Sequence, residues 1–120
     1  MNLGQIGKTA EDKTAAFLRK NGFKVIKRNY SCRFGEIDII AEKGEFIIFV
    51  EVKARKENSI VSAEEAVGSD KIQRIMLTAN DFILKTECEL APRFDLAQIT
   101  VKEKTDGEIG YSLHYTQNAF

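Results

Sequence analysis

Hydrophobic positions along the chain follow first a helical and then a strand period. In residues 8–21 the apolar side chains recur every three or four positions, which predicts a helix, and Gly22 stands where a helix ends. Glu11 lies at the edge of the apolar stripe of this helix, so an acidic side chain points partly inward. From residue 23 the period shortens to two, and residues 23–30 are predicted to form a strand with basic side chains outward.

Two longer hydrophobic strands follow. Residues 35–55 read GEIDIIAEKGEFIIFVEVKAR, which predicts a β-hairpin with Lys43 and Gly44 in a two-residue turn. The segment SAEE at residues 62–65 has the pattern of a helix capping box, and a longer helix is predicted after Asp70. The expected core-facing stripe of that helix is Ile72, Ile75, Met76, Ala79, Phe82 and Ile83.

The last part of the chain predicts two further strands. Residues 93–101 read RFDLAQITV, and a turn at residues 105–107 leads into a strand over residues 109–115. The strands on either side of the long helix can be parallel neighbours, whereas the hairpin is antiparallel. We therefore expect one α/β domain over residues 1–120, with a mixed central sheet of five strands flanked by helices.

Charges interrupt the hairpin where a buried sheet would exclude them. Glu36 and Asp38 stand at the start of the first strand, and Glu51 and Lys53 stand toward the end of the second. Because hairpin strands run in opposite directions, these two ends meet. With the turn placed as above, Glu36 lies opposite Glu51, and Asp38 lies opposite Phe49. Asp38 and Glu51 are then diagonal neighbours on one face, with α-carbons about 7–8 Å apart.

A divalent cation would explain this concentration of charge. Like charges facing each other destabilise a sheet, and Mg²⁺ or Mn²⁺ takes carboxylate oxygens together with retained waters. Such an ion polarises a phosphate and helps to generate hydroxide from water, while Lys53 would stabilise the charge that accumulates on the phosphate. The alternative interpretation is a surface salt bridge, because Glu-x-Lys is common on strands.

Composition and charge add limits to this picture. The chain is 43% hydrophobic and 30% charged, has no apolar run of ~20 residues and begins without a secretory pattern, so we expect a soluble protein. Cys32 and Cys88 have neither zinc-site nor redox spacing, and we expect reduced thiols in a cytoplasmic protein. Residues 1–34 hold eight Lys/Arg against two acids, and residues 35–120 hold ten against sixteen. This asymmetry suits a polyanion partner, although solvated helix faces explain it more simply.

Other reaction classes have little support. Residues 7–9, Gly-Lys-Thr, resemble the end of a phosphate-binding loop, but Gly4 stands two positions too near and no apolar strand precedes it. His114 is the single histidine and lies in the last predicted strand, which favours a structural role. With one histidine, Ser-His-Asp and Cys-His mechanisms are unsupported.

The charged hairpin resembles a known pattern. An acidic strand start, a turn and a hydrophobic strand that ends in Glu-x-Lys resemble the PD-(D/E)xK nuclease superfamily. The segments RNYSCRFGEIDIIA, FVEVKAR and RFDLAQI more closely resemble the YraN-like family of predicted endonucleases, which is itself similar to archaeal Holliday junction resolvases. The similarity runs from GKTAEDKTAAFLRKNGF to the terminal NAF. It implies a restriction-endonuclease-like fold with the order α-β-β-β-α-β-β.

The resemblance also implies roles for single residues. Asp38 and Glu51 would hold Mg²⁺ or Mn²⁺, and Lys53 would be the catalytic lysine. Glu11 stands where the resolvases place a helix glutamate at the metal site, and Glu36 would support the site. The candidates for phosphate contacts or loop support are Arg28, Asn29, Arg55, Lys71 and Arg74.

Two functional hypotheses follow. The first is a metal-dependent endonuclease that hydrolyses DNA phosphodiester bonds, on branched or single-stranded DNA, in repair or recombination. The alternative is a non-catalytic nucleic-acid-binding or assembly module that retains the nuclease fold. Only the first requires divalent metal at Asp38 and Glu51. A homodimer is expected if the substrate is a four-way junction. The chain departs from the family pattern at Ala10, where Gly is usual, and at residues 59–66, SIVSAEEA, where many members carry an aromatic-Gly stretch.

Overall fold

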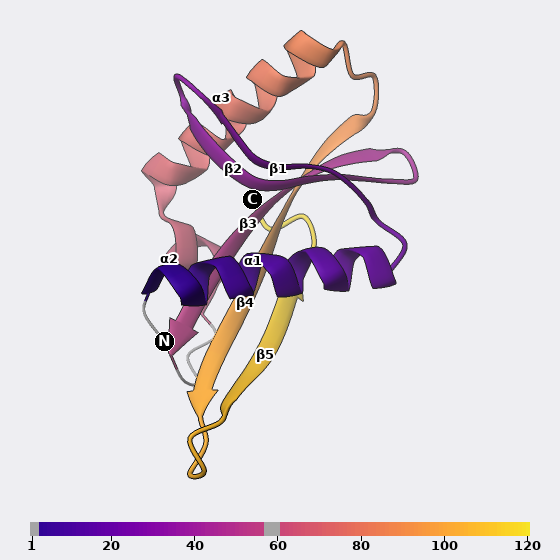
Figure 1. Ribbon diagram of the computed structural model, residues 1–120. Coiled ribbons are helices and arrows are strands. Elements are labelled where there is room, and N and C mark those ends of the chain that lie inside the picture. The colour runs from indigo at the N-terminus through magenta and orange to yellow at the C-terminus, as the bar shows by residue number, and fades with distance from the viewer. Residues whose placement is uncertain (1–2, 57–60) are drawn as a thin grey trace.

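The computed structural model describes residues 3–56 and 61–120, which form a five-stranded sheet between helices (Figure 1). In the described residues, no helix is both long enough and apolar enough to cross a membrane. The elements in chain order are α1 (Leu3–Lys20), β1 (Lys24–Cys32), β2 (Gly35–Lys43), β3 (Phe46–Lys56), α2 (Ala63–Val67), α3 (Ser69–Thr86), β4 (Ala91–Glu103) and β5 (Ile109–Thr116).

The strands lie in the order in which they occur in the chain. Strands β1, β2 and β3 form an antiparallel meander, β3 and β4 are parallel, and β5 pairs antiparallel with β4. The parallel step is the one that α2 and α3 connect. The prediction of a mixed five-stranded α/β sheet flanked by helices is thus confirmed, and the architecture is consistent with a restriction-endonuclease-like fold.

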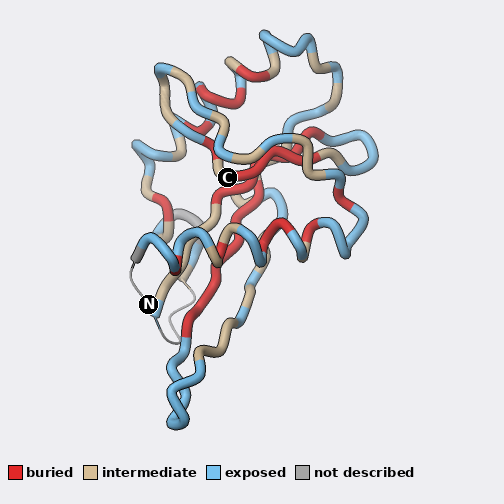
Figure 2. The backbone as a smooth tube through the Cα atoms, viewed as in Figure 1, coloured by how far each residue is buried: buried red, intermediate tan, exposed pale blue. Residues whose placement is uncertain are grey.

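The two long helices cover opposite faces of the sheet. Helix α1 packs Ala15 and Leu18 against Val50 and its neighbours on one face. Helix α3 packs Ile75 and Phe82 on the other face, and the two helices are seen on either side of the central strands in Figure 1. The buried positions in Figure 2 follow the central strands β3 and β4. Because both faces of β3 are covered, its first half is an unbroken apolar run rather than an alternating one.

The hairpin turn differs from the prediction by one residue. Lys43 pairs with Phe46, so Gly44 and Glu45 form the turn, and Gly44 has a φ of 57°. Two-residue hairpin turns require positive φ at the first central position, which glycine adopts without steric cost. The predicted pairings of Asp38 with Phe49 and of Glu36 with Glu51 are therefore both wrong. The register moves by two residues, however, so every side chain stays on its predicted face.

The helices also differ from their predicted limits. Helix α1 begins at Leu3 rather than at residue 8, because Ile6 extends the buried stripe by one turn beyond Ala10. The Gly-Lys-Thr segment lies inside this helix. In the capping box, the Ser62 hydroxyl accepts a hydrogen bond from the Glu65 backbone N–H at 3.3 Å, as predicted. Met76 was predicted to face the core but is 42% exposed.

A buried ionic network joins β4 to the end of the chain. Asp95 is 0% exposed and accepts two hydrogen bonds from the Arg93 guanidinium, both at 2.9 Å. The Tyr115 hydroxyl donates to the same carboxylate at 2.6 Å, and the backbone N–H of Asn118 donates at 2.9 Å. A fully buried carboxylate is tolerated here because it is paired and hydrogen-bonded at both oxygens. The network fixes residues after β5 against the sheet.

Candidate functional site

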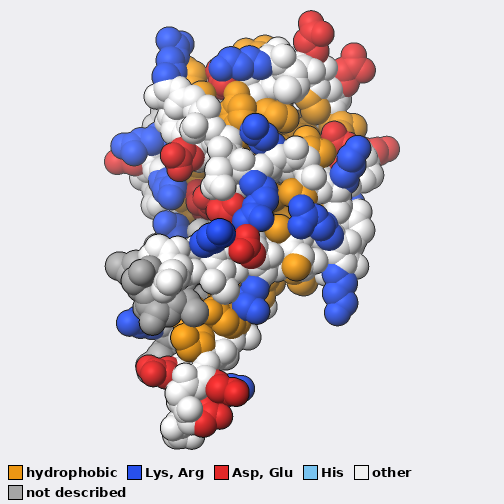
Figure 3. Space-filling model, in the orientation of Figure 1, with side chains coloured by type: hydrophobic (Ala, Val, Ile, Leu, Met, Phe, Trp, Pro, Cys, Tyr) orange, Lys and Arg blue, Asp and Glu red, His pale blue; other side chains and the backbone are white. Residues whose placement is uncertain are grey.

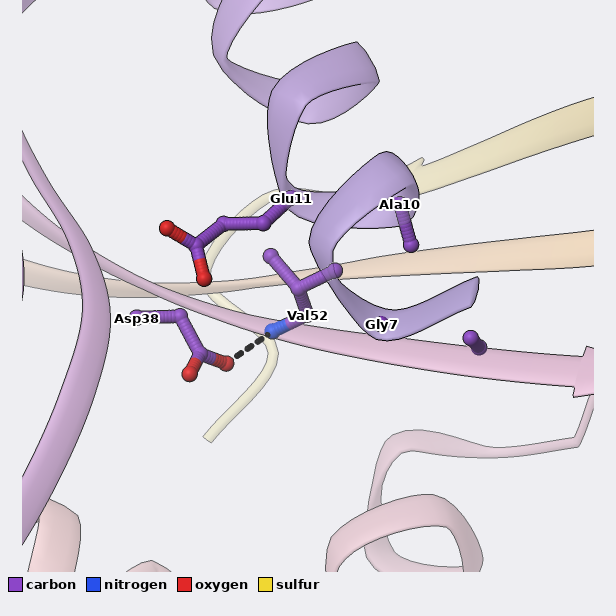
Figure 4. Close-up of a pocket in the computed structure, with 6 residues that line it drawn as sticks. Gly7, Ala10, Glu11, Asp38 and Val52 are labelled. Atoms are coloured by element: carbon purple, nitrogen blue, oxygen red, sulfur yellow. Dashed lines mark hydrogen bonds between the residues drawn. The ribbon is translucent and has the colours of Figure 1, made fainter. Parts of the chain in front are cut away.

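Strands β2 and β3 lose their backbone pairing at the charged end of the hairpin. Their register runs from the turn to Ile39 opposite Val50. Beyond this pair, the Asp38 side chain takes the place of a backbone carbonyl, and its Oδ2 accepts a hydrogen bond from the Val52 backbone N–H at 2.8 Å (Figure 4). The carboxylate of Asp38 therefore lies between the two strands, where it is fixed by the backbone.

This position exposes Asp38 to pockets on both sides of the sheet. One pocket, of about 190 Å³, is shared with Glu11 of α1. The other, of about 260 Å³, is shared with Glu51, Lys71 and Arg74. Figure 4 shows Glu11 extending from α1 toward the region where Asp38 bonds Val52. Asp38 is thus the residue common to both pockets.

Glu51 is a buried carboxylate beside Asp38. Its side chain is 5% exposed, and burial, followed by a hydrogen bond to Asp38 and repulsion from its charge, raises the pKa of Glu51 to about 8. Glu51 Oε2 is buried without a hydrogen bond. The Lys71 Nζ lies 3.6 Å from this atom, which is within ion-pair distance but too long for a hydrogen bond. The two acids predicted to share a face are therefore brought together, with an acceptor atom left unsatisfied.

Two lysines complete this side of the site. Lys53 lies on the same face of β3 as Glu51, one side-chain step further along. Burial and the nearby Lys71 ammonium lower the pKa of Lys53. Two ammonium groups and two carboxylates are thus concentrated at the charged end of the hairpin.

Glu11 is engaged by two side chains of β1. The Arg28 guanidinium contacts Glu11 Oε1 at 2.9 Å, and the Asn29 side-chain amide donates to the same oxygen at 3.1 Å. Arg28 also contacts Asp12 at 2.6 Å, so this basic residue is neutralised by two acids. Within the described ranges, no three His, Cys, Asp or Glu side chains gather into a group that could hold a metal. The structure thus gathers two of the three acids that were expected at the metal.

The remaining predicted residues divide between the pocket and its surroundings. Glu36 and Arg74 line the 260 Å³ pocket with Lys71. Arg55 lies further along β3, opposite Thr100, with its Nε buried and without a hydrogen bond. Arg28 and Asn29 are engaged with Glu11 on the α1 face. On that face basic and acidic side chains are intermixed, as Figure 3 shows, rather than gathered into one basic surface.

Two contacts at the site were not predicted from the sequence. The hydrogen bond from the Val52 N–H to Asp38 depends on the separation of β2 from β3. No residue pattern in the sequence predicts that separation. The contact of Lys71 with Glu51 depends on how α3 crosses the sheet. The sequence feature that could have indicated the second contact is Gly68. It precedes α3 with a φ of 81°, and a helix that starts after it has Lys71 in its first turn.

Comparison with known proteins places the chain in a family. The model of the uncharacterised protein family UPF0102 matches residues 10–99. The chain belongs to the UPF0102 family. A UPF0102 protein of Dictyoglomus turgidum is 41% identical over 121 residues, covering 100% of both chains. The UPF0102 protein FN1370 of Fusobacterium nucleatum is 49% identical over 83 residues, covering 69% of this chain and 70% of its own. The UPF0102 match includes every element that contributes to the two pockets around Asp38 apart from the start of α1.

Proposed function

We propose that this UPF0102 protein is a metal-dependent endonuclease that hydrolyses phosphodiester bonds in DNA. The observation that carries the proposal is the pairing of Asp38 with buried Glu51, whose Oε2 has no hydrogen bond, beside the Lys53 ammonium. The fold and the resemblance of the charged hairpin to the PD-(D/E)xK superfamily support the same assignment. The fold alone would not support this assignment, because one fold can host many functions.

The donor set fits a hard divalent cation. Two carboxylates that repel each other, one of them with an unsatisfied buried oxygen, are stabilised by a positive ion between them. Mg²⁺ and Mn²⁺ accept such oxygen donors and fill their other positions with water and phosphate oxygens, so two protein carboxylates suffice. When bound, the ion supplies polarisation of the phosphate and a more acidic water. Asp38 and Glu51 would hold it.

The other side chains would orient and stabilise the substrate. The Val52 N–H fixes the carboxylate of Asp38, so its geometry does not have to be organised when substrate binds. Lys53 places a partly desolvated positive charge beside the acids, where negative charge develops on the phosphate during water attack. Lys71 and Arg74 line the adjoining pocket, and in the proposed reaction they would contact a phosphate of the DNA backbone.

The second candidate is a nucleic-acid-binding or assembly module without catalysis. The observation that favours it is the engagement of Glu11 with Arg28 and Asn29, which leaves two acids rather than three at the site. This candidate requires no divalent metal at Asp38 and Glu51.

Cleavage of end-labelled DNA separates the two functions. Single-stranded, flap and four-way junction substrates are incubated with Mg²⁺ or Mn²⁺ and with wild type, Asp38→Asn, Lys53→Ala or the matched control Lys85→Ala. Lys85 belongs to α3 and pairs with Asp81 outside the site. We expect wild type and Lys85→Ala to cut, and each site substitution to reduce cutting on the order of 100-fold or more. No cutting by folded wild type would favour the binding module, and undiminished cutting by Asp38→Asn would place the activity elsewhere.

A further inference from the structure

The contact between Lys71 and Glu51 joins a half-exposed lysine to a buried carboxyl group. Glu51 is 5% exposed and belongs to the central strand β3, whereas Lys71 is 45% exposed and extends from the first turn of α3. The 3.6 Å separation of Lys71 Nζ from Glu51 Oε2 is within ion-pair distance but too long for a hydrogen bond. Such a pair is easily separated, because a half-exposed lysine keeps its side-chain freedom and its hydration.

The ammonium of Lys71 approaches the atom that a metal would need. Oε2 is the Glu51 oxygen that is buried without a hydrogen bond, and the pocket beside it is lined by both Asp38 and Lys71. A divalent ion held by Asp38 and Glu51 would place two further positive charges close to Lys71. Charges of one sign repel strongly in a partly buried site, so metal and ammonium compete for this carboxylate.

A second lysine makes the crowding of positive charge greater. Lys53 already lies beside Glu51, and the proximity of Lys71 helps to lower the pKa of Lys53. Of these two lysines, Lys53 is partly buried on β3 and Lys71 is the more exposed. Lys71 is therefore the group that can withdraw when a third positive charge arrives.

We propose that the Lys71 ammonium occupies the position beside the unsatisfied Oε2 of Glu51 in the metal-free protein and is displaced when a divalent metal binds. The inference rests on the proposed function for the metal itself, but it assigns to Lys71 a role that the proposed reaction does not contain. Displaced from Glu51, the ammonium remains at the pocket lined by Arg74, where it can contact a phosphate. Metal and DNA binding are then reciprocally coupled, since each favours the conformation in which Lys71 has left Glu51.

Metal affinity without DNA tests this role directly. Free Mn²⁺ is measured by electron paramagnetic resonance at pH 8.5 during titration of wild type, Lys71→Gln, Lys71→Arg and Lys85→Gln. Removing the competing ammonium should tighten Mn²⁺ binding by roughly three- to tenfold in Lys71→Gln. Lys71→Arg, which retains the charge, should remain close to wild type. Lys85→Gln removes an equal charge from the same helix, where Lys85 pairs with Asp81 at 2.9 Å, and should change the affinity by less than about twofold.

The outcomes separate failure of this inference from failure of the proposed function. Equal Mn²⁺ affinity in wild type and Lys71→Gln, with loss of binding in Asp38→Asn, would overturn the role of Lys71 alone. An equal gain in Lys85→Gln would also overturn it, because net charge would then be the cause. No Mn²⁺ binding by any folded variant would overturn the metal site and this inference together. Thermal melting of Lys71→Gln verifies its fold, which a half-exposed position should tolerate.

Discussion

The Asp38 side chain has a structural role that is separable from its charge. Its Oδ2 satisfies the Val52 N–H at the point where β2 and β3 lose their pairing. Asp38→Asn keeps an acceptor oxygen and should retain near-wild-type stability in metal-free buffer. Asp38→Ala leaves the N–H without this partner and should lose about 1–3 kcal/mol of unfolding free energy. Urea denaturation at pH 7 measures both, and equal stability of the two variants would show that water replaces the carboxylate.

Glu51 should make the stability of the metal-free protein depend on pH. Burial raises the pKa of Glu51 from 4.5 to about 8, so between these values the folded state retains a proton that the unfolded state has lost. The unfolding free energy must then fall as pH rises from about 5 to about 8 and change little above. The groups that face Glu51 are Asp38, which raises this pKa, and Lys53 and Lys71, which oppose the rise.

Glu51→Gln removes this titration while keeping the volume of the side chain. Relative to wild type, the variant should gain on the order of 2–4 kcal/mol between pH 5 and pH 8, when both are measured by urea denaturation in EDTA. The difference should nearly vanish at pH 4. Parallel stability curves for the two proteins across this range would contradict the assignment of a protonated, desolvated Glu51.

Residue patterns predicted part of the site because of one property of strands. Because side chains alternate with a period of two, Asp38 and Glu51 stay on the same face under any even shift of register. The misplaced turn therefore did not change the prediction that these two acids lie together. No comparable rule predicts the environment of Glu11. Its partners Arg28 and Asn29 stand 17 and 18 residues away on β1, and their approach depends on how α1 lies across the sheet. Local periodicity contains no information on that angle.

At the scale of elements, β4 joins the β1–β3 meander to β5 and to the end of the chain. It pairs with β3 over eleven residue pairs and carries Asp95, which ties Arg93, Tyr115 and Asn118 together. The motif RFDLAQI was identified by resemblance, but its Asp95 was not predicted to be structural. A buried acid in a strand looks the same in sequence whether it serves catalysis or packing. The distinction lies in the partners that the fold supplies.

Removing the charge of Asp95 should lower the unfolding free energy more than removing the hydroxyl of Tyr115. Asp95→Asn leaves Arg93 without its buried counter-ion and should destabilise the protein by about 3–5 kcal/mol. Tyr115→Phe removes one hydrogen bond while its ring keeps the contacts with Phe17 and Phe23, and should cost about 1–2 kcal/mol. Thermal and urea melts measure both. If Tyr115→Phe proved as damaging as Asp95→Asn, the ion pair would not be the dominant contribution.

The limits of elements were predicted less well than their kinds. The sequence indicated every strand and both long helices, because their periodicity extends over many residues. It misplaced the start of α1 and the hairpin turn, because the position of each depends on a single residue. Ile6 extends the helix because the sheet offers a surface to bury it, and Gly44 takes the first turn position because of its positive φ. The start of the helix and the position of the turn therefore depend on tertiary structure and backbone geometry rather than on composition.

At the scale of the whole molecule, charge is balanced rather than basic. The chain has 18 Lys/Arg and 18 Asp/Glu, and Arg28 on the α1 face is neutralised by Glu11 and Asp12. A protein with no net charge gains little from long-range, non-specific attraction to the DNA backbone. A bound divalent ion would therefore change the local charge around Asp38 and Glu51 by a large fraction, and binding of a polyanion should depend on it.

Divalent metal should also stabilise the whole fold, because at the proposed site it would bind the native arrangement of Asp38 and Glu51 and not the unfolded chain. At a Mg²⁺ or Mn²⁺ concentration about tenfold above its Kd, the gain is about 1.4 kcal/mol, which for a domain of 120 residues corresponds to a rise in Tm of about 5 °C. The rise should be larger at pH 8.5 than at pH 6.5, because a metal must displace the proton of Glu51 at the lower pH. Scanning calorimetry against an EDTA baseline of matched ionic strength measures it. Asp38→Asn should show no rise, whereas an equal rise in that variant would assign the effect to non-specific screening.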